Sequence, residues 1–132
     1  MTVQNLASLY IRRSAAALLE GNWALVADCM AEDFHMEDRR LSLAVTLDKA
    51  EAVAMTRVMG DLGVTSIEVE DLETRGKHHA LFRITNYAQD FMVCTLSVAK
   101  VREDERAVAL VIFDEDALDA ARAELESLAE GT

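Results

Sequence analysis

The feature that most constrains the fold is a change in the spacing of apolar residues at Val64. Before this point, apolar side chains recur every three or four residues, as on one face of an amphipathic helix. After it they alternate with polar ones, so that Ile67 and Val69 fall on one face of an extended chain and Glu68 and Glu70 on the other. The chain therefore divides into a helical first half and a strand-rich second half.

Helices are expected before Val64 and at the end of the chain. Asn22 supplies an N-cap for the second helix, and Gly21 and Gly60 end the first and third. In the last helix, Asp114 or Asp116 is expected to cap the first turn, where acidic side chains also favour the positive end of the helix dipole. The expected helices cover 5–21, 22–34, 47–60 and 114–131.

The remaining segments have the alternation and turn composition of strands. A first strand follows the second helix, and two hairpins follow Val64, the second closing across the charged turn at 102–106. The expected strands cover 35–45, 64–75, 78–88, 90–101 and 107–114. Helices segregated from a mainly antiparallel sheet predict an α+β fold. We expect a cone-shaped roll in which a curved sheet wraps around the N-terminal helices, with a C-terminal helix added and a hollow left for ligand.

The composition narrows the classes of partner. All 132 residues fit one domain, expected to span 1–132. The formal charge of −11, with scattered basic residues, opposes binding to nucleic acid or to an anionic membrane. The sequence has neither a run of about 18 apolar residues nor a signal-peptide pattern at its start, so we expect a cytoplasmic protein.

Metal and cofactor chemistry is not predicted. Cys29 and Cys94 lie in apolar surroundings without the spacing of metal ligands, and we expect them to be buried free thiols. Adjacent strand residues point to opposite faces, so His78 and His79 would not share one ion. We therefore expect neither a metal nor a cofactor.

The segment LEGNWALVADCMAEDFHMEDRR, residues 19–40, resembles the nuclear transport factor 2-like superfamily, which includes SnoaL-type cyclases and ketosteroid isomerases. It matches the pattern of a helix, a Gly-Asn turn, a second helix, an acidic step and a strand carrying Glu-Asp. The tail at 113–131 is similar to that of actinobacterial members, in which the domain often ends a larger protein. The resemblance covers nearly the whole chain and implies the same cone. It implies no single activity, because one fold hosts many functions.

The resemblance singles out Asp38, which falls where ketosteroid isomerases place their general base. A carboxylate at the mouth of an apolar cone loses water and can shuttle a proton between substrate carbons. Two alternatives stay open: Asp38 lines the pocket without chemistry, or it forms a salt bridge with Arg39, Arg40 or an arginine of another strand. A weaker candidate is His35, which would need a bend to reach Asp38 because residues three apart on a strand point to opposite faces.

Steroid isomerisation itself is disfavoured. The tyrosine and late-strand acid that form the oxyanion hole in those enzymes correspond here to positions near Ser14 and to Cys94, Thr95 and Ser97. Without strong donors, an enolate would lose most of its electrostatic stabilisation.

Apolar side chains from both halves of the chain are candidates to line a pocket. The expected ligand-binding residues are Trp23, Phe34, Met55, Met59, Phe82, Phe91, Val93 and Thr95. The strand at 78–88 leaves one alternative open. If Arg83 and Tyr87 face inward, the pocket suits a polar or anionic ligand; if Phe82 and Ile84 do, it suits an apolar one.

The sequence thus favours a domain that binds a small, apolar molecule and forms a homodimer through its exposed sheet face. One alternative is an isomerase, cyclase, hydratase or lyase of the SnoaL type that uses Asp38 as general acid or base. Another is a non-catalytic association module of a larger regulatory protein.

Overall fold

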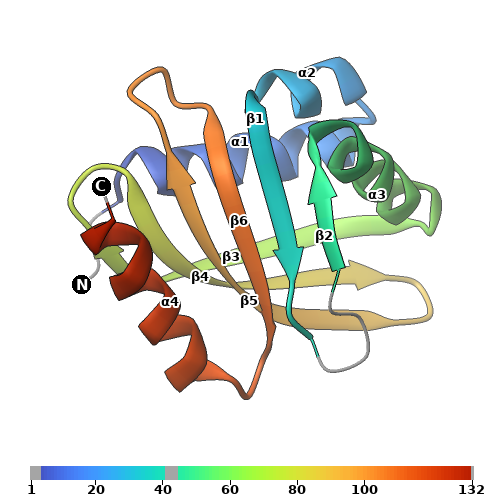
Figure 1. The fold of residues 1–132 in the computed structure, drawn as a ribbon. Helices are drawn as coiled ribbons and strands as arrows, with labels where there is room; N and C mark the ends of the chain where they lie inside the picture. Colours follow the sequence, from blue (N-terminus) through green and yellow to red (C-terminus); the bar gives the residue numbers. More distant parts are fainter. Residues whose placement is uncertain (1–3, 41–44, 132) are drawn as a thin grey trace.

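The computed structural model describes residues 4–40 and 45–131 of the chain (Figure 1). Its helices are α1 (Leu6–Glu20), α2 (Trp23–Asp28), α3 (Lys49–Asp61) and α4 (Leu118–Glu130). Its strands are β1 (Met30–Asp38), β2 (Val45–Asp48), β3 (Val64–Arg75), β4 (His79–Ala88), β5 (Met92–Val101) and β6 (Ala107–Asp114).

The strands form one curved sheet in the order β2-β1-β6-β5-β4-β3, in which only β1 and β6 run parallel among the described strands. In Figure 1, α1 crosses behind the sheet and α4 lies in front of it. The helices therefore occupy opposite faces of the sheet, with α1, α2 and α3 on the inner face and α4 on the outer face. The expected α+β cone with a C-terminal helix is confirmed.

Alternation along β4 decides which side chains face inward. Phe82 is fully buried in a core cluster with side chains of α1 and α2, and Ile84 packs against the same cluster. The neighbouring Leu81 is equally buried, but in a second cluster with α4 on the outer face. Arg83 also faces outward, where it pairs with Glu70 of β3 at 3.0 Å. The sequence did not decide which face of β4 points inward. In the structure it is the apolar face, with Phe82 and Ile84.

The boundary between α2 and β1 differs from the prediction. The second helix was expected to continue to Phe34, whereas α2 ends at Asp28 and β1 begins at Met30. The cause is pairing with a distant strand, because Met30 aligns with Ala107, whose N–H donates to the carbonyl oxygen of Cys29 at 2.9 Å. Ala107 is far from Met30 in the sequence, so the local pattern of residues around Met30 does not predict this pairing.

The strand expected at 35–45 is also divided. β1 ends at Asp38, residues 41–44 lie outside the described residues, and β2 begins at Val45 and returns antiparallel to β1. The following helix begins where expected, because Asp48 and Glu51 form a capping box at the start of α3.

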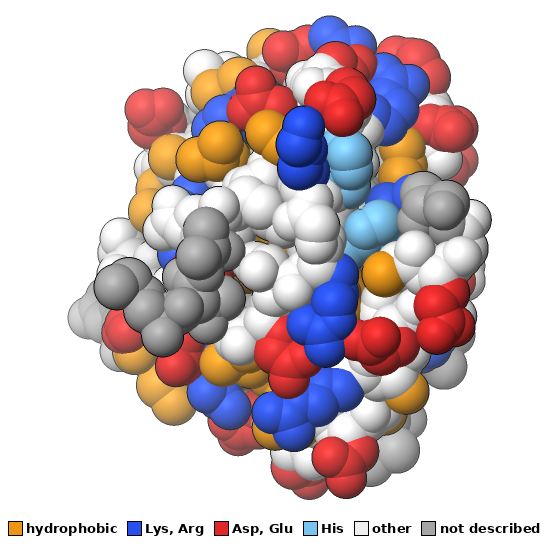
Figure 2. All heavy atoms as spheres, turned by 90° about the vertical axis from the view of Figure 1, so that its left-hand side faces the viewer, with side chains coloured by type: hydrophobic (Ala, Val, Ile, Leu, Met, Phe, Trp, Pro, Cys, Tyr) orange, Lys and Arg blue, Asp and Glu red, His pale blue; other side chains and the backbone are white. Residues whose placement is uncertain are grey.

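The predicted acidic cap of the last helix is not formed. Asp114 ends β6, and α4 begins at Leu118 after Ala117, which provides no side-chain cap. Ion pairs to the sheet hold the helix instead, among them Arg39 with Glu124 at 2.5 Å. Two more join Arg75 to Glu126 and Glu73 to Arg122. Figure 2 shows acidic and basic side chains interspersed over this end of the molecule.

Cys29 is buried as expected, whereas Cys94 is only half-buried, and both are free. Among the described residues, no helix is both long and apolar enough to cross a membrane.

Candidate functional site

A cavity of about 150 Å³ lies between α3, the end of α1 and the inner face of the sheet. We call it the α3 cavity. It is lined by Leu18, Met36, Asp38, Arg40, Met55, Thr56, Met59, Asn86, Val93, Thr95 and Ile112. Most of this wall is apolar, and Asp38 and Arg40 are its charged members.

Strand alternation brings Asp38 to the cavity. Phe34, Met36 and Asp38 point to the inner face of β1, and the side chain of Asp38 is only 3% exposed. On β6, Ile112 lies beside Asp38 in the register and lines the same cavity. The position implied by the resemblance is thus inside the hollow.

Arg40 closes around this carboxylate. Its Nε donates to Oδ1 at 2.9 Å and to Oδ2 at 3.2 Å, its Nη2 donates to Oδ2 at 2.6 Å, and its backbone N–H donates to Oδ1 at 3.1 Å. A carboxylate offers about four acceptor positions, and three N–H groups of Arg40 occupy most of them, because the single Nε hydrogen is shared between the two oxygens. Asp38 therefore combines two of the alternatives left by the sequence, because it lines the cavity and forms an ion pair.

The same contacts hold the charge on Arg40. The hydrogen bonds that Arg40 donates to Asp38 raise the pKa of the Arg40 guanidinium despite the opposing effect of burial, and the charges of Asp38 and Asp114 add to this. The cavity thus contains a formally neutral ion pair with one further carboxylate close by. The Nη1 of Arg40 makes no hydrogen bond to any residue in 4–40 or 45–131, since the contacts with Asp38 use Nε, Nη2 and the backbone N–H.

The structure separates His35 from Asp38. His35 is exposed on the opposite face of β1 and aligns with Asp48 of β2. The irregularity in the pairing of β1 with β6 lies before His35, and from His35 to Asp38 the register is regular, so the bend that a His–Asp dyad needs is missing there.

The residues predicted to bind ligand fall into two groups. Met55, Met59, Val93 and Thr95 line the α3 cavity. The other four do not line it. Phe34 and Phe82 are buried in the core, and Trp23 packs against Gly60 and Arg57. Phe91 lies half-buried in the turn before β5.

Several lining residues are absent from the prediction, namely Leu18, Met36, Arg40, Thr56, Asn86 and Ile112. Asn86 could have been found from the sequence, since it shares a strand face with Phe82 and Ile84. From the sequence, Arg40 is predicted only as a possible salt-bridge partner of Asp38. Its place in the cavity wall depends on the path of the chain after β1, which the residue pattern does not give.

A second, smaller hollow of about 110 Å³ adjoins the first and is lined by Ile11, Ser14, Ala15, Leu18, Thr56, Ile67, Val69, Ile84 and Asn86. We call it the β3 chamber. Leu18, Thr56 and Asn86 line both hollows.

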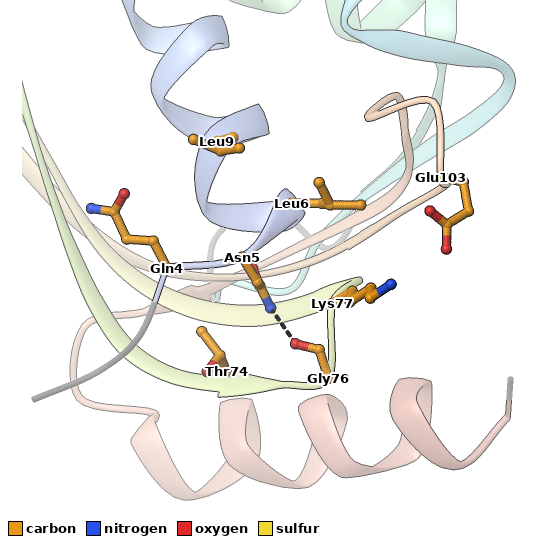
Figure 3. Close-up of a pocket in the computed structure, with 8 residues that line it drawn as sticks. All are labelled: Gln4, Asn5, Leu6, Leu9, Thr74, Gly76, Lys77 and Glu103. Atoms are coloured by element: carbon orange, nitrogen blue, oxygen red, sulfur yellow. Dashed lines mark hydrogen bonds between the residues drawn. The ribbon is translucent and has the colours of Figure 1, made fainter.

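A larger depression of about 580 Å³ lies at the start of α1, away from Asp38 (Figure 3). It opens widely to solvent, and its most central polar group is already used, because the Asn5 amide donates to the carbonyl oxygens of Gly76 and His79 at 3.0 Å each. This contact fixes the β3–β4 turn to α1. The α3 cavity is less open to solvent and contains a buried carboxylate paired with Arg40, so it is the better candidate site.

Metal ligands do not gather at any of these hollows. Within residues 4–40 and 45–131, no three His, Cys, Asp or Glu side chains are arranged to hold a metal ion.

Comparison with known proteins identifies the fold. No family model and no curated protein matches the sequence. Among solved structures, an NTF-2 like protein of unknown function from Burkholderia xenovorans matches with a TM-score of 0.63 and 12% identity, covering 83% of this chain and 84% of that one. A Mycobacterium tuberculosis LEH-like epoxide hydrolase matches with a TM-score of 0.64 and 13% identity, covering 91% and 84%. A computationally designed 17-OHP binder matches with a TM-score of 0.64 and 13% identity, covering 86% and 94%.

These matches place the chain in a class of α+β fold in which a curved sheet packs against helices. The chain has the nuclear transport factor 2-like fold, and the resemblance seen in the sequence is confirmed at this level. The actinobacterial type of that resemblance stays a prediction. The three relatives include an epoxide hydrolase and a designed binder, so the fold leaves the choice between binding and catalysis to the site.

Proposed function

We propose that this protein binds a small, neutral, mainly apolar molecule in the α3 cavity. The observation that carries the proposal is a cavity with mostly apolar walls whose buried carboxylate already accepts hydrogen bonds from three N–H groups of Arg40. Such a wall favours hydrocarbon, while Thr95 and Arg40 are polar lining residues that can bind one oxygen atom of a ligand.

The size and charge of the cavity limit the ligand further. A hollow of about 150 Å³ matches an engineered apolar cavity that accepts benzene, and lies below the range of sites for drug-sized molecules. An anion would lie beside the Asp38 carboxylate, and Arg40, the positively charged lining residue, is already paired with that carboxylate. The proposed ligand is therefore compact and uncharged.

Methionine methyl groups provide a direct test. Met36, Met55 and Met59 line the cavity, whereas Met92 is 61% exposed on the outer face and serves as an internal control. In a protein labelled with ¹³C at the methionine methyls, titration with cyclohexanol should shift the three cavity signals and leave Met92 in place. If the cavity signals stay still for cyclohexanol and benzene, the proposal fails and a pure association module is favoured.

A cavity-filling variant provides the matched control. Val93→Phe places a larger side chain into the cavity, and Met92→Phe makes a similar change on the outward side of the same strand. We expect Val93→Phe to abolish the cyclohexanol shifts and Met92→Phe to preserve them.

The position of Asp38 supports a second candidate, an enzyme that moves a proton next to a carbonyl group. Asp38 lines the cavity, but Arg40 would have to release it first, because general bases need a free lone pair within reach of the proton. Exchange of the α-protons of cyclohexanone in D₂O measures this activity. An enzyme should accelerate the exchange, and Asp38→Asn should abolish it while the cyclohexanol shifts persist. Equal exchange with both proteins would eliminate the candidate.

We also propose that two copies associate through the part of the outer sheet face that α4 leaves uncovered. Tyr87 pairs with the exposed Met92 there, and Thr85 pairs with the half-buried Cys94. Light scattering on a sizing column should give a dimer at micromolar concentration, and Met92→Glu should shift it to monomer. A monomeric parent protein would contradict the proposal.

A further inference from the structure

The α3 cavity and the β3 chamber are adjacent compartments rather than separate sites. Leu18, Thr56 and Asn86 line both, so these side chains form the partition between them. The Thr56 hydroxyl donates to the Ala52 carbonyl of its own helix at 2.9 Å, which leaves its methyl group as its contribution to the partition. The Asn86 side chain makes no hydrogen bond to any residue in the described part of the chain.

The two compartments differ in chemistry. The α3 cavity contains Asp38, Arg40 and Thr95, whose hydroxyl makes no hydrogen bond within residues 4–40 and 45–131. The β3 chamber contains no charged lining residue, and its walls are mainly branched aliphatic side chains of α1, β3 and β4, with Ser14 as an added hydroxyl. One end of the combined space is therefore polar and the other is apolar.

The apolar side chains around the β3 chamber are incompletely buried. Ile67, Val69 and Ile84 point to the inner side of the sheet but are only half-buried, unlike Phe82 on the same strand as Ile84. Apolar surface that faces a hollow gains free energy when hydrocarbon covers it. The chamber is thus suited to an alkyl group that enters from the α3 cavity.

We propose that the ligand is an elongated neutral amphiphile, with an oxygen-containing head at Arg40 and Thr95 and an alkyl tail that passes Asn86 into the β3 chamber. This inference rests on the proposed binding function and adds the class of ligand. Asn86 is a positioning residue at the partition, because its unengaged amide can turn aside without breaking a hydrogen bond to the described residues. A tail through both compartments also makes room for a longer molecule than the α3 cavity alone accepts.

A series of primary alcohols tests the tail. Titration of the ¹³C-methionine protein with 1-butanol to 1-decanol should show affinity rising about fourfold per added methylene, as expected for a buried CH₂ group. The rise should stop at the length that fills the β3 chamber. Octanoate should bind at least about tenfold more weakly than 1-octanol, because its charge would lie beside the Asp38 carboxylate, whose Arg40 partner is already engaged.

Matched variants on neighbouring residues of α1 locate the tail. Ala15 lines the β3 chamber, whereas Ala16 is exposed beside it. Ala15→Leu should shorten the alcohol length at which affinity stops rising and leave 1-butanol unchanged, whereas Ala16→Leu should preserve the parent profile. The parent series needs no variant, so it decides the question even if Ala15→Leu does not fold.

The outcomes separate the two proposals. Binding of cyclohexanol without any gain from 1-butanol to 1-octanol, or a parent-like profile in folded Ala15→Leu, overturns the tail inference and leaves the binding function standing. Tighter binding of octanoate than of 1-octanol overturns the neutral class of ligand. If neither cyclohexanol nor any alcohol shifts the cavity methyl groups, the binding function fails and the inference falls with it.

Discussion

The two halves of β4 have the same alternating pattern but different surroundings. From His79 to Phe82 every residue is buried, whereas from Arg83 to Ala88 every residue is only half-buried. In the first half, helices fill both faces of the sheet, with Phe82 inside and Leu81 under α4. In the second half, the inner face borders the two hollows instead. One strand therefore serves the core at one end and the candidate site at the other, and curvature of the sheet makes the difference.

The largest expected effect tests the filled half. Phe82→Ala should lower the free energy of unfolding by about 3–5 kcal/mol, because it removes a fully buried ring and leaves a cavity. Ile84→Ala, on the same face of β4, should lower it by less than about 2 kcal/mol, since part of that side chain already faces open space. Urea denaturation measures both. Equal losses would show that the two halves are packed alike.

A smaller effect is expected at the ion pair in the hollow half. Asp38→Ala leaves the Arg40 guanidinium without its partner, and with the Arg40 side chain 27% exposed we expect a loss of about 2 kcal/mol. The double change to Asp38→Leu and Arg40→Leu should lose less than Asp38→Ala alone, because it leaves no charge unpaired. Glu37→Ala, which breaks a more exposed pair with Arg39, should change stability by no more than about 1 kcal/mol. A double variant less stable than Asp38→Ala would contradict this account.

The smallest expected effect concerns pH and the buried start of β4. Burial lowers the pKa of His79 below its usual value, and the nearby charges of Lys100 and His78 lower it further. The unfolded chain then binds the proton more readily, so stability is complete above about pH 6.5 and falls as the pH drops from there toward the lowered pKa. The slope from one such group is at most about 1.4 kcal/mol per pH unit.

Melting temperatures measured between pH 7.5 and 5 check this expectation. His79→Gln should flatten the decline below pH 6.5, and His78→Gln should reduce it by less, because it removes only one of the causes that lower the pKa of His79. A decline that is unchanged in His79→Gln would assign the pH dependence to other groups.

The fold was predictable because its main signals are local. Alternation after Val64, the turns between strands and the capping residues of α1 to α3 depend on neighbours in the sequence, and they place most elements within a few residues. The start of β1 was missed because Met30 is extended only through its pairing with Ala107. Residues 30–34 have helical spacing when they are considered alone.

The candidate site was less predictable than the fold. Alternation gives the relative orientation of Phe82 and Arg83 but does not say which face is concave, and that depends on where the helices pack. Phe34 and Phe82 are predicted to line the pocket but lie in the core. A large aromatic ring suits either environment, and the space left by neighbouring side chains decides whether it lines a cavity or fills the core. The ion pair between Arg40 and Asp38 depends on the path of the chain after β1, and the spacing of apolar residues does not predict that path.

The parallel contact between β1 and β6 has a consequence for the order in which the protein forms. β1 is complete at Asp38, but its partner β6 begins only at Ala107, after β2, α3, β3, β4 and β5 have intervened in the sequence. During synthesis the ribosome must therefore add β2 to β6 before this pair can close, and contacts of such long sequence separation are slow to form. The α3 cavity takes its walls from both strands, so it is incomplete until this pair has closed. A ligand that binds this cavity can stabilise the finished protein but cannot assist the nascent chain before that stage.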